Sequence, residues 1–260
     1  MFNIIKADNT RLLKSKSFWI TLGFFAILFV GIMYMQNTAN KEFINTTNSG
    51  KEAGFYITVD FVIKSLNLFV TMFGYPFGTL FLGIYLSIFV CNEYSSGYIK
   101  NIATLDEGRV GLVLAKAAVA CVITILILVI TYGLGFSLGN IIIDGFKIDS
   151  INEILKSIGI MFLLSMAMFS LIIFTSTLFK SKVAGIIVAF LVISGMSSPF
   201  INSFFDLIRL SFLSEYTLSH FSNVYVSAQG DVLIKMIVMC IIYILVYNIL
   251  SIAVLSKRDL

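Results

Sequence analysis

Charged residues are scarce in this 260-residue chain, and long stretches hold none. Asp, Glu, Lys and Arg together supply 12% of the residues, whereas hydrophobic residues supply 58%. A soluble fold of this length has too little interior to bury so much apolar surface. The composition therefore excludes an ordinary soluble domain and indicates a protein that resides in lipid.

Motifs that bind nucleotides or metals are also missing. No G-x-x-x-x-G-K-[ST] phosphate loop occurs, since Gly50-Lys51 is followed by Glu52. The single His and the three isolated cysteines lack the spacing of a metal site, and no G-x-S-x-G nucleophile motif is present. We therefore predict that the chain is not an enzyme, has no catalytic or metal-binding residue and no nucleic-acid partner, and leaves any nucleotide to another chain.

Six charge-free stretches are each longer than the roughly 18–20 residues that a helix needs to cross a bilayer. They cover 17–40, 65–92, 117–143, 157–179, 183–205 and 236–256. Within each stretch the apolar residues would lie on all sides of a helix and do not alternate with polar ones. This pattern indicates helices rather than barrel strands. We predict an all-α integral membrane protein, one transmembrane domain over 1–260. Its six spans lie near 18–36, 66–90, 113–139, 157–179, 183–204 and 234–255.

The orientation follows from the basic residues. An even number of spans places both termini on one side, and the segments on that side hold more Lys and Arg than the opposite segments do. The short turn between the fourth and fifth spans carries Lys180 and Lys182 without an acid. The positive-inside rule therefore predicts cytoplasmic termini.

Residues 1–16 have an amphipathic pattern that predicts a helix lying in the cytoplasmic membrane interface. The apolar side chains near one face are Phe2, Ile5, Leu12 and Leu13. The cations that decorate the rest, placed near anionic head groups, are Lys6, Arg11, Lys14 and Lys16. The alternative is a basic tail that only sets the topology.

The segment 205–231 before the last span is too apolar for a solvated loop and too charged to cross the membrane. It predicts short extracellular helices that re-enter the outer leaflet. Pro199, just before this segment, should end or kink the fifth span, and Pro76 should bend the second.

The inner segment 93–109 reads as a helix end, a turn and then a short amphipathic helix. Its first part is E-Y-S-S-G-Y-I-K, from Glu93 to Lys100. Such a helix, in a loop that need only reverse the chain, indicates docking on a partner; the alternative is an ordinary connection. Because no span carries an ionisable residue near its centre, an ion-coupled carrier or ion channel is disfavoured.

Three features resemble the ABC-2 type permease subunits of bacterial ABC transporters. The start, I-I-K-A-D-N-T-R-L-L-K-S-K-S-F-W-I, resembles the basic elbow helix of that family. Glu93 to Lys100 is similar to its E-x-x-x-G-T-x-K signature, although Tyr98 stands where the family has Thr. The third feature is the six-span layout with a membrane-dipping segment before the last helix. Among these permeases, the chain looks most like those of bacteriocin or lantibiotic immunity and cytolytic-peptide export.

The resemblance implies a half-channel in the bacterial plasma membrane that exports amphipathic or hydrophobic peptides. It would pair with a second permease subunit, identical or not, above two separate ABC ATP-binding subunits that hold ATP and Mg. The residues expected to couple to the ATPase are Glu93, Tyr94, Ser96, Gly97, Tyr98, Lys100 and Arg109.

A substrate path is expected along spans two and five. Its candidate residues are Phe73, Tyr75, Pro76, Ser194, Met196, Ser198 and Pro199. The alternative for these residues is helix packing. Two other functions stay open: a non-transporting scaffold or sensor that partners an ATPase, and an ion-coupled carrier.

Overall fold

The computed structural model describes residues 2–52, 65–99, 108–225 and 230–257, with the side chains of 43–52 excepted. Helices dominate these residues, which confirms the all-α prediction, and one isolated bridge joins Ser65 to Lys147. The helices are α1 (Phe2–Lys14), α2 (Lys16–Glu52), α3 (Leu66–Phe69), the π-helix η1 (Val70–Gly74), α4 (Tyr75–Ser95), α6 (Gly108–Ile142), α7 (Ile151–Phe179), α8 (Lys182–Ile193), α9 (Ser198–Leu207), the 3-10 helix η2 (Ser211–Tyr216), α10 (Leu218–Val224) and α11 (Gly230–Ser256).

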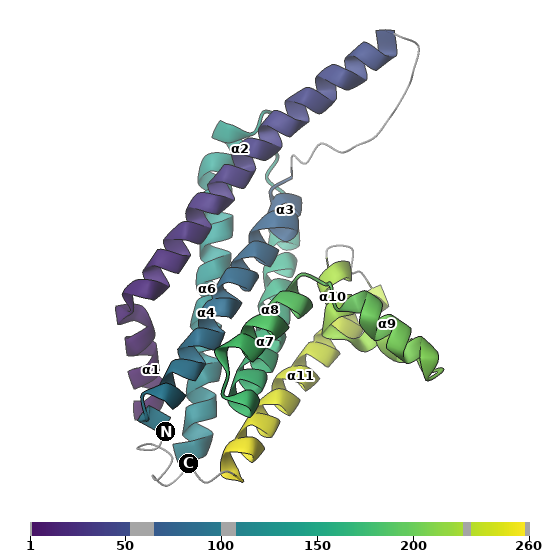
Figure 1. Cartoon of the computed structure of the whole chain (residues 1–260). Helices are drawn as coiled ribbons and strands as arrows, with labels where there is room; N and C mark the ends of the chain where they lie inside the picture. The colour runs from purple at the N-terminus through teal and green to yellow at the C-terminus, as the bar shows by residue number, and fades with distance from the viewer. Residues whose placement is uncertain (1, 53–64, 100–107, 226–229, 258–260) are drawn as a thin grey trace.

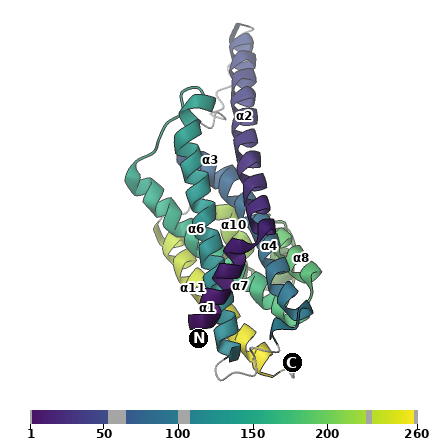
Figure 2. The same cartoon turned by 90° about the vertical axis from the view of Figure 1, so that its left-hand side faces the viewer.

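Five segments of the described chain are long and apolar enough to cross a membrane as predicted, and they pack into one bundle (Figure 1). They are Lys16–Glu42, Leu66–Ser95, Gly108–Ile142, Ile151–Phe179 and Gly230–Ser256. α2 continues as a helix to Glu52, beyond the predicted end near residue 36, and projects past the bundle. α1 and the end of α11 lie at the same end of the bundle, as an even number of crossings requires (Figures 1 and 2).

The predicted fifth span, 183–204, is broken into two helices close to Pro199, where an end or kink was expected. α8 holds 12 residues and rises only about 18 Å at 1.5 Å per residue, less than the roughly 30 Å hydrocarbon core. α9 then leaves at an angle of 83°. The break is at Gly195, whose φ of +69° is a left-handed conformation that favours glycine. Pro199 lies in the first turn of α9, so it starts the second piece of a broken span.

The second span carries a π-turn immediately before Pro76. The Tyr75 N–H bonds to the carbonyl of Val70, five residues back, instead of to that of Thr71. In a π-turn the Thr71 carbonyl would accept from the N–H five residues later, at position 76. That residue is proline, which has no N–H. The Thr71 carbonyl therefore has no helical donor. The expected distortion at Pro76 takes this form.

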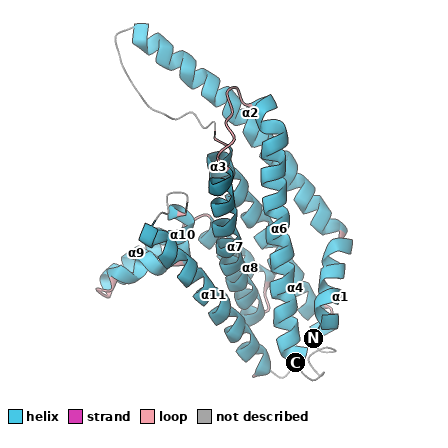
Figure 3. Cartoon of the chain, turned by 180° about the vertical axis from the view of Figure 1, so that it is seen from behind, coloured by secondary structure: helices cyan, strands magenta, loops and turns pink. Residues whose placement is uncertain are grey.

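The segment before the last span folds into short helices, as expected. α9, η2 and α10 follow one another beside α11, and α9 projects from the bundle (Figure 3). Phe200, Phe204 and Leu207 on α9 are exposed. Exposed apolar side chains also cover the outer faces of α2 and α11, which suits contact with lipid better than contact with water.

Small residues let the short α8 pack closely. A Cβ atom added to Gly185 would collide with the hydroxyls of Ser87 on α4 and Ser176 on α7. Ser87 also donates to the carbonyl of Lys182 at 3.1 Å. Such close approach at small residues is the usual way in which membrane helices associate.

Candidate functional site

Four charged side chains meet at the end of the bundle that holds α1 and the end of α11. Asp8 and Arg11 come from α1, Glu93 from the last turn of α4, and Lys116 from α6. The Lys116 ammonium donates to Asp8 Oδ2 and Glu93 Oε1, and the Arg11 guanidinium donates to the same Glu93 oxygen. Arg11 also lies 3.8 Å from Asp8 Oδ1. We call these four residues the charge cluster.

Three of the four residues in the charge cluster are buried, the Arg11 side chain is 37% exposed, and the cluster is electrically balanced. The exposed fractions of Asp8, Glu93 and Lys116 are 0%, 1% and 4%, and two carboxylates offset two cations. Buried charges are tolerated only when they are paired, and removal of one partner leaves an uncompensated charge. The Phe89 ring lies 4.3 Å from the Arg11 guanidinium and 5.3 Å from the Lys116 ammonium, which adds cation–π attraction. The cluster therefore joins α1, α4 and α6.

The amphipathic helix α1 contacts the rest of the protein with a charged side chain as well as with an apolar one. Asp8 and Leu12, one turn apart on α1, are both buried. Phe2 and Leu13 are exposed at 82% and 45%, and Ile5 is half-buried. The predicted apolar face is therefore divided between a protein-facing Leu12 and outward-facing Phe2 and Leu13. Arg11, expected near lipid head groups, pairs with Glu93 while its side chain stays 37% exposed.

The predicted coupling segment begins at Glu93, in the last turn of α4, and the helix ends two residues later at Ser95. The Ser96 N–H bonds to the carbonyl of Asn92 at 3.1 Å, and the Ser96 hydroxyl donates to the carbonyl of Glu93 at 3.3 Å. Gly97 follows with a φ of +72°. Glycine just beyond a helix end favours this left-handed conformation, because a Cβ atom would strain it.

The remaining coupling candidates lie in three places. The Tyr98 ring is 5.1 Å from the Arg11 guanidinium, and burial, helped by the nearby Asp8 charge, raises the pKa of Tyr98. The Tyr94 ring is 5.9 Å from the Lys180 ammonium. Arg109 instead donates to the carbonyl of Ser256, at the end of α11, at 2.6 Å. Lys100 and the expected coupling helix over 100–107 lie outside the described residues.

The predicted path residues form two groups, and each group reaches α10. Tyr75 is buried with its ring centroid 5.2 Å from that of Tyr225, which directly follows α10, while Phe73 packs on Phe69 and Pro76 is half-buried. The second group occupies the break between α8 and α9. There Ser198 accepts from Asn223 of α10 at 3.1 Å, whereas Ser194, Met196 and Pro199 are exposed. The structure supports a packing role for Tyr75 and Ser198.

Sequence reasoning did not identify Asp8 and Lys116 as site residues. Asp8 is the one acid in residues 1–16, three positions before Arg11 and four before Leu12. An isolated acid on a basic helix is a signal for a specific partner. Lys116 directly precedes the charge-free stretch 117–143, a place where a lysine is typical of a cation that sets topology. Within the described ranges, no group of three or more His, Cys, Asp or Glu side chains is placed to hold a metal ion.

The chain was compared with known proteins. A family model described as "ABC-2 family transporter protein" matches residues 4–195, a range that includes all four residues of the charge cluster. No curated protein matches the chain.

Proposed function

The chain belongs to the ABC-2 transporter family, and from that premise we propose that it is a permease subunit through which a separate ATP-binding subunit drives export of amphipathic peptides. Membership of the family makes the chain a membrane component of an ABC transporter. The coupling route, the direction and the substrate are proposals.

The observation that carries the coupling proposal is the charge cluster beside the start of the coupling segment. Glu93, four residues before Gly97, holds both Lys116 of α6 and Arg11 of α1. A force on the segment after Gly97 therefore acts on three helices together, because a buried ion pair resists separation by several kcal/mol. Arg109, through the Ser256 carbonyl, extends the connection to α11.

The proposed orientation places the charge cluster in the cytoplasm, where an ATP-binding subunit would dock. Two observations support it. Lys14, Lys180 and Lys182 flank the helix ends on the same side as the cluster, in agreement with the positive-inside rule. The Gly97 turn also lies at this end, next to Tyr98 and α1.

An amphipathic substrate is proposed from the resemblance and from the chemistry of the spans. The described span centres offer aromatic, aliphatic and hydroxyl side chains, and the charged residues lie toward the helix ends. Such surfaces suit an apolar or amphipathic solute and lack a group that would bind a coupling ion. A second permease subunit would complete the path.

The test is ATP hydrolysis by the chain co-purified with its ATP-binding subunit, with and without a cationic amphipathic peptide. We expect the peptide to stimulate hydrolysis severalfold. Glu93→Gln and Gly97→Val should each reduce the stimulation about threefold, the first by unbalancing the charge cluster and the second by straining the turn. Gly97→Asn is the matched control, because asparagine tolerates a positive φ, and Glu215→Gln is the control for the loss of an exposed carboxylate.

The outcomes separate the remaining functions. A complex that forms but does not respond to peptide would favour a scaffold or sensor, and flux by the chain alone without ATP would favour an ion-coupled carrier. Stimulation that persists in both Glu93→Gln and Gly97→Val would refute the coupling route while leaving transport intact. Thermal unfolding of each variant separates uncoupling from loss of structure.

A further inference from the structure

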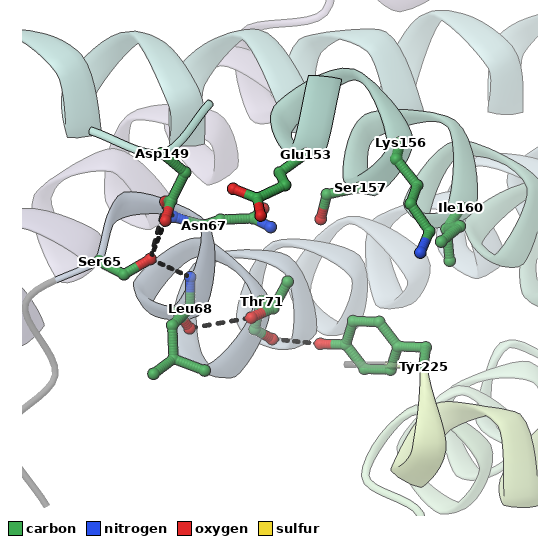
Figure 4. Close-up of a pocket in the computed structure, with 10 residues that line it drawn as sticks. All are labelled: Ser65, Asn67, Leu68, Thr71, Asp149, Glu153, Lys156, Ser157, Ile160 and Tyr225. Atoms are coloured by element: carbon green, nitrogen blue, oxygen red, sulfur yellow. Dashed lines mark hydrogen bonds between the residues drawn. The ribbon is translucent and has the colours of Figure 1, made fainter. Parts of the chain in front are cut away.

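A polar cavity of about 300 Å³ lies at the end of the bundle opposite the charge cluster (Figure 4). Its walls are α3 and η1 on one side, the first turns of α7 on another, and Tyr225 after α10. α7 has 29 residues and is therefore about 43 Å long, longer than the roughly 30 Å hydrocarbon core. The charge-free part of α7 begins only at Ser157, so we expect its first turns, with Glu153 and Lys156, at the level of the lipid head groups.

Hydrogen bonds fix the first wall of the cavity. The Asp149 carboxylate accepts from the Ser65 hydroxyl at 2.7 Å and from the Asn67 N–H at 2.6 Å. The Asn67 side-chain oxygen accepts from the Tyr132 hydroxyl at 2.9 Å. Asp149 is thereby committed to holding α3, and this wall does not need a ligand to become ordered.

The second wall depends on the π-turn before Pro76. The Thr71 carbonyl has lost its helical donor, and the Tyr225 hydroxyl donates to it instead, as Figure 4 shows. Burial raises the pKa of Tyr225 well above that of an exposed tyrosine, so the phenol keeps its proton and continues to donate. Tyr225 therefore closes one side of the cavity as a fixed part of the structure.

Glu153 and Lys156 bring opposite charges to the same cavity. They are three positions apart on α7, which places them on one helix face, and Figure 4 shows Ser157 between their side chains. Among the residues that the structure describes, Glu153 Oε2 accepts a 3.3 Å capping bond from the Ser150 N–H and no other hydrogen bond. Lys156 has no ion-pair partner within 4.0 Å among the described residues. The cavity therefore presents an acceptor at one end and a cationic donor at the other.

We propose that this cavity binds a zwitterionic group, with an ammonium at Glu153 and a phosphate or carboxylate at Lys156 and Ser157. A ligand with a single sign of charge would meet repulsion at one end. The volume, at the low end for small-molecule sites, suits a phosphoethanolamine head group. This inference goes beyond the transport function and does not depend on it, since binding requires neither ATP nor the ATP-binding subunit.

The test measures lipid retained by the full-length chain in detergent, using native mass spectrometry after incubation with equimolar phosphatidylethanolamine and phosphatidylglycerol. We expect preferential retention of phosphatidylethanolamine. Lys156→Gln and Glu153→Gln should each lower that retention at least threefold; glutamine can still cap α7, so the fold is preserved. The matched controls are Lys147→Gln and Glu215→Gln, which remove exposed charges that do not line the cavity and should leave retention unchanged.

Soluble glycerophosphoethanolamine distinguishes the two sources of the zwitterion. Displacement of the bound lipid by it would mean that the head group alone is recognised and that a free solute can occupy the cavity. Failure to displace the lipid, with the variant effects intact, would mean that the acyl chains contribute and the ligand is a membrane lipid. Equal retention of phosphatidylglycerol, or unchanged retention in both cavity variants, would overturn the proposal.

Discussion

Replacement of Lys116 by methionine tests the charge cluster most directly. Methionine approximates the length of the lysine side chain but removes the charge, so Asp8 and Glu93 would share only Arg11. Removal of one partner from a buried ion pair costs about 3–5 kcal/mol. We expect a loss of this size because Lys116 is the buried cation that donates hydrogen bonds to both carboxylates.

The decisive comparison is a double-mutant cycle with Asp8→Asn. Asp8→Asn alone leaves an excess positive charge, whereas Asp8→Asn with Lys116→Met restores balance between Glu93 and Arg11. The double variant should therefore be more stable than the sum of the single losses predicts, by about 1–3 kcal/mol.

The chain provides its own probe for this measurement. Trp19 is the single tryptophan, and its indole donates to the Leu13 carbonyl at 2.7 Å, where α1 meets α2. Unfolding in detergent can thus be followed by fluorescence beside the helix that carries Asp8. Lys147→Met, an exposed lysine at the other end, should change stability by less than about 0.5 kcal/mol. Losses that add within about 0.5 kcal/mol in the cycle would refute the cluster as a unit.

Two further variants test local features of the fold. Tyr225→Phe should cost about 1–3 kcal/mol, because it leaves the Thr71 carbonyl buried without a donor; thermal unfolding measures the loss, and a Tyr225→Phe protein as stable as the native one would contradict the role of the π-turn. Gly195→Ala should destabilise by about 1 kcal/mol or more, because its φ of +69° strains any Cβ atom and that atom would collide with Asn223. Comparison of the double variant Gly195→Ala with Asn223→Ala against Asn223→Ala alone separates the two causes: the single variant accounts for the lost bond to Ser198, and the further loss in the double variant is the backbone strain.

The positions of the long helices could be predicted from the sequence because the exclusion of charge from lipid is a local rule. A stretch without charged residues, such as 117–143, must either cross the membrane or be buried; its end lies one residue from the end of α6 at Ile142, although α6 begins nine residues earlier, at Gly108. The rule fails for 183–205, which is charge-free yet contains the break at Gly195. Absence of charge reveals where a chain can lie in lipid but not whether its helix is continuous.

The candidate site was only partly predictable, because its pairs are distant in the sequence. Glu93 emerged from the pattern of a helix end followed by glycine, which is local. Asp8 and Lys116 are 108 positions apart, and their pairing depends on how α1 packs along α6. Basic residues such as Arg11 and Lys116 satisfy the positive-inside rule, and the sequence alone does not reveal that they also form ion pairs inside the protein.

α4 connects both ends of the molecule, which leads to a prediction about transport. Glu93 anchors its inner end in the charge cluster, and Thr71, in the π-turn that precedes α4, is held by Tyr225. Glu93 lies 22 positions after Thr71, a distance of about 33 Å along a helix. If this helix moves as one rigid body, Glu93→Gln and Tyr225→Phe interrupt the same step. The double variant should then lose no more peptide-stimulated ATP hydrolysis than the worse single variant.

The control for this comparison is Tyr243→Phe. Tyr243 on α11 donates to the carbonyl of Tyr216 at 2.8 Å, so its replacement removes a tyrosine hydrogen bond of the same kind without touching α4. We expect the effects of Tyr243→Phe and Glu93→Gln to multiply, as effects at independent sites do. If the losses of peptide-stimulated hydrolysis caused by Tyr225→Phe and Glu93→Gln also multiply, the two ends of α4 act separately. The charge cluster would then couple the inner ends of α1, α4 and α6 without moving the outer end.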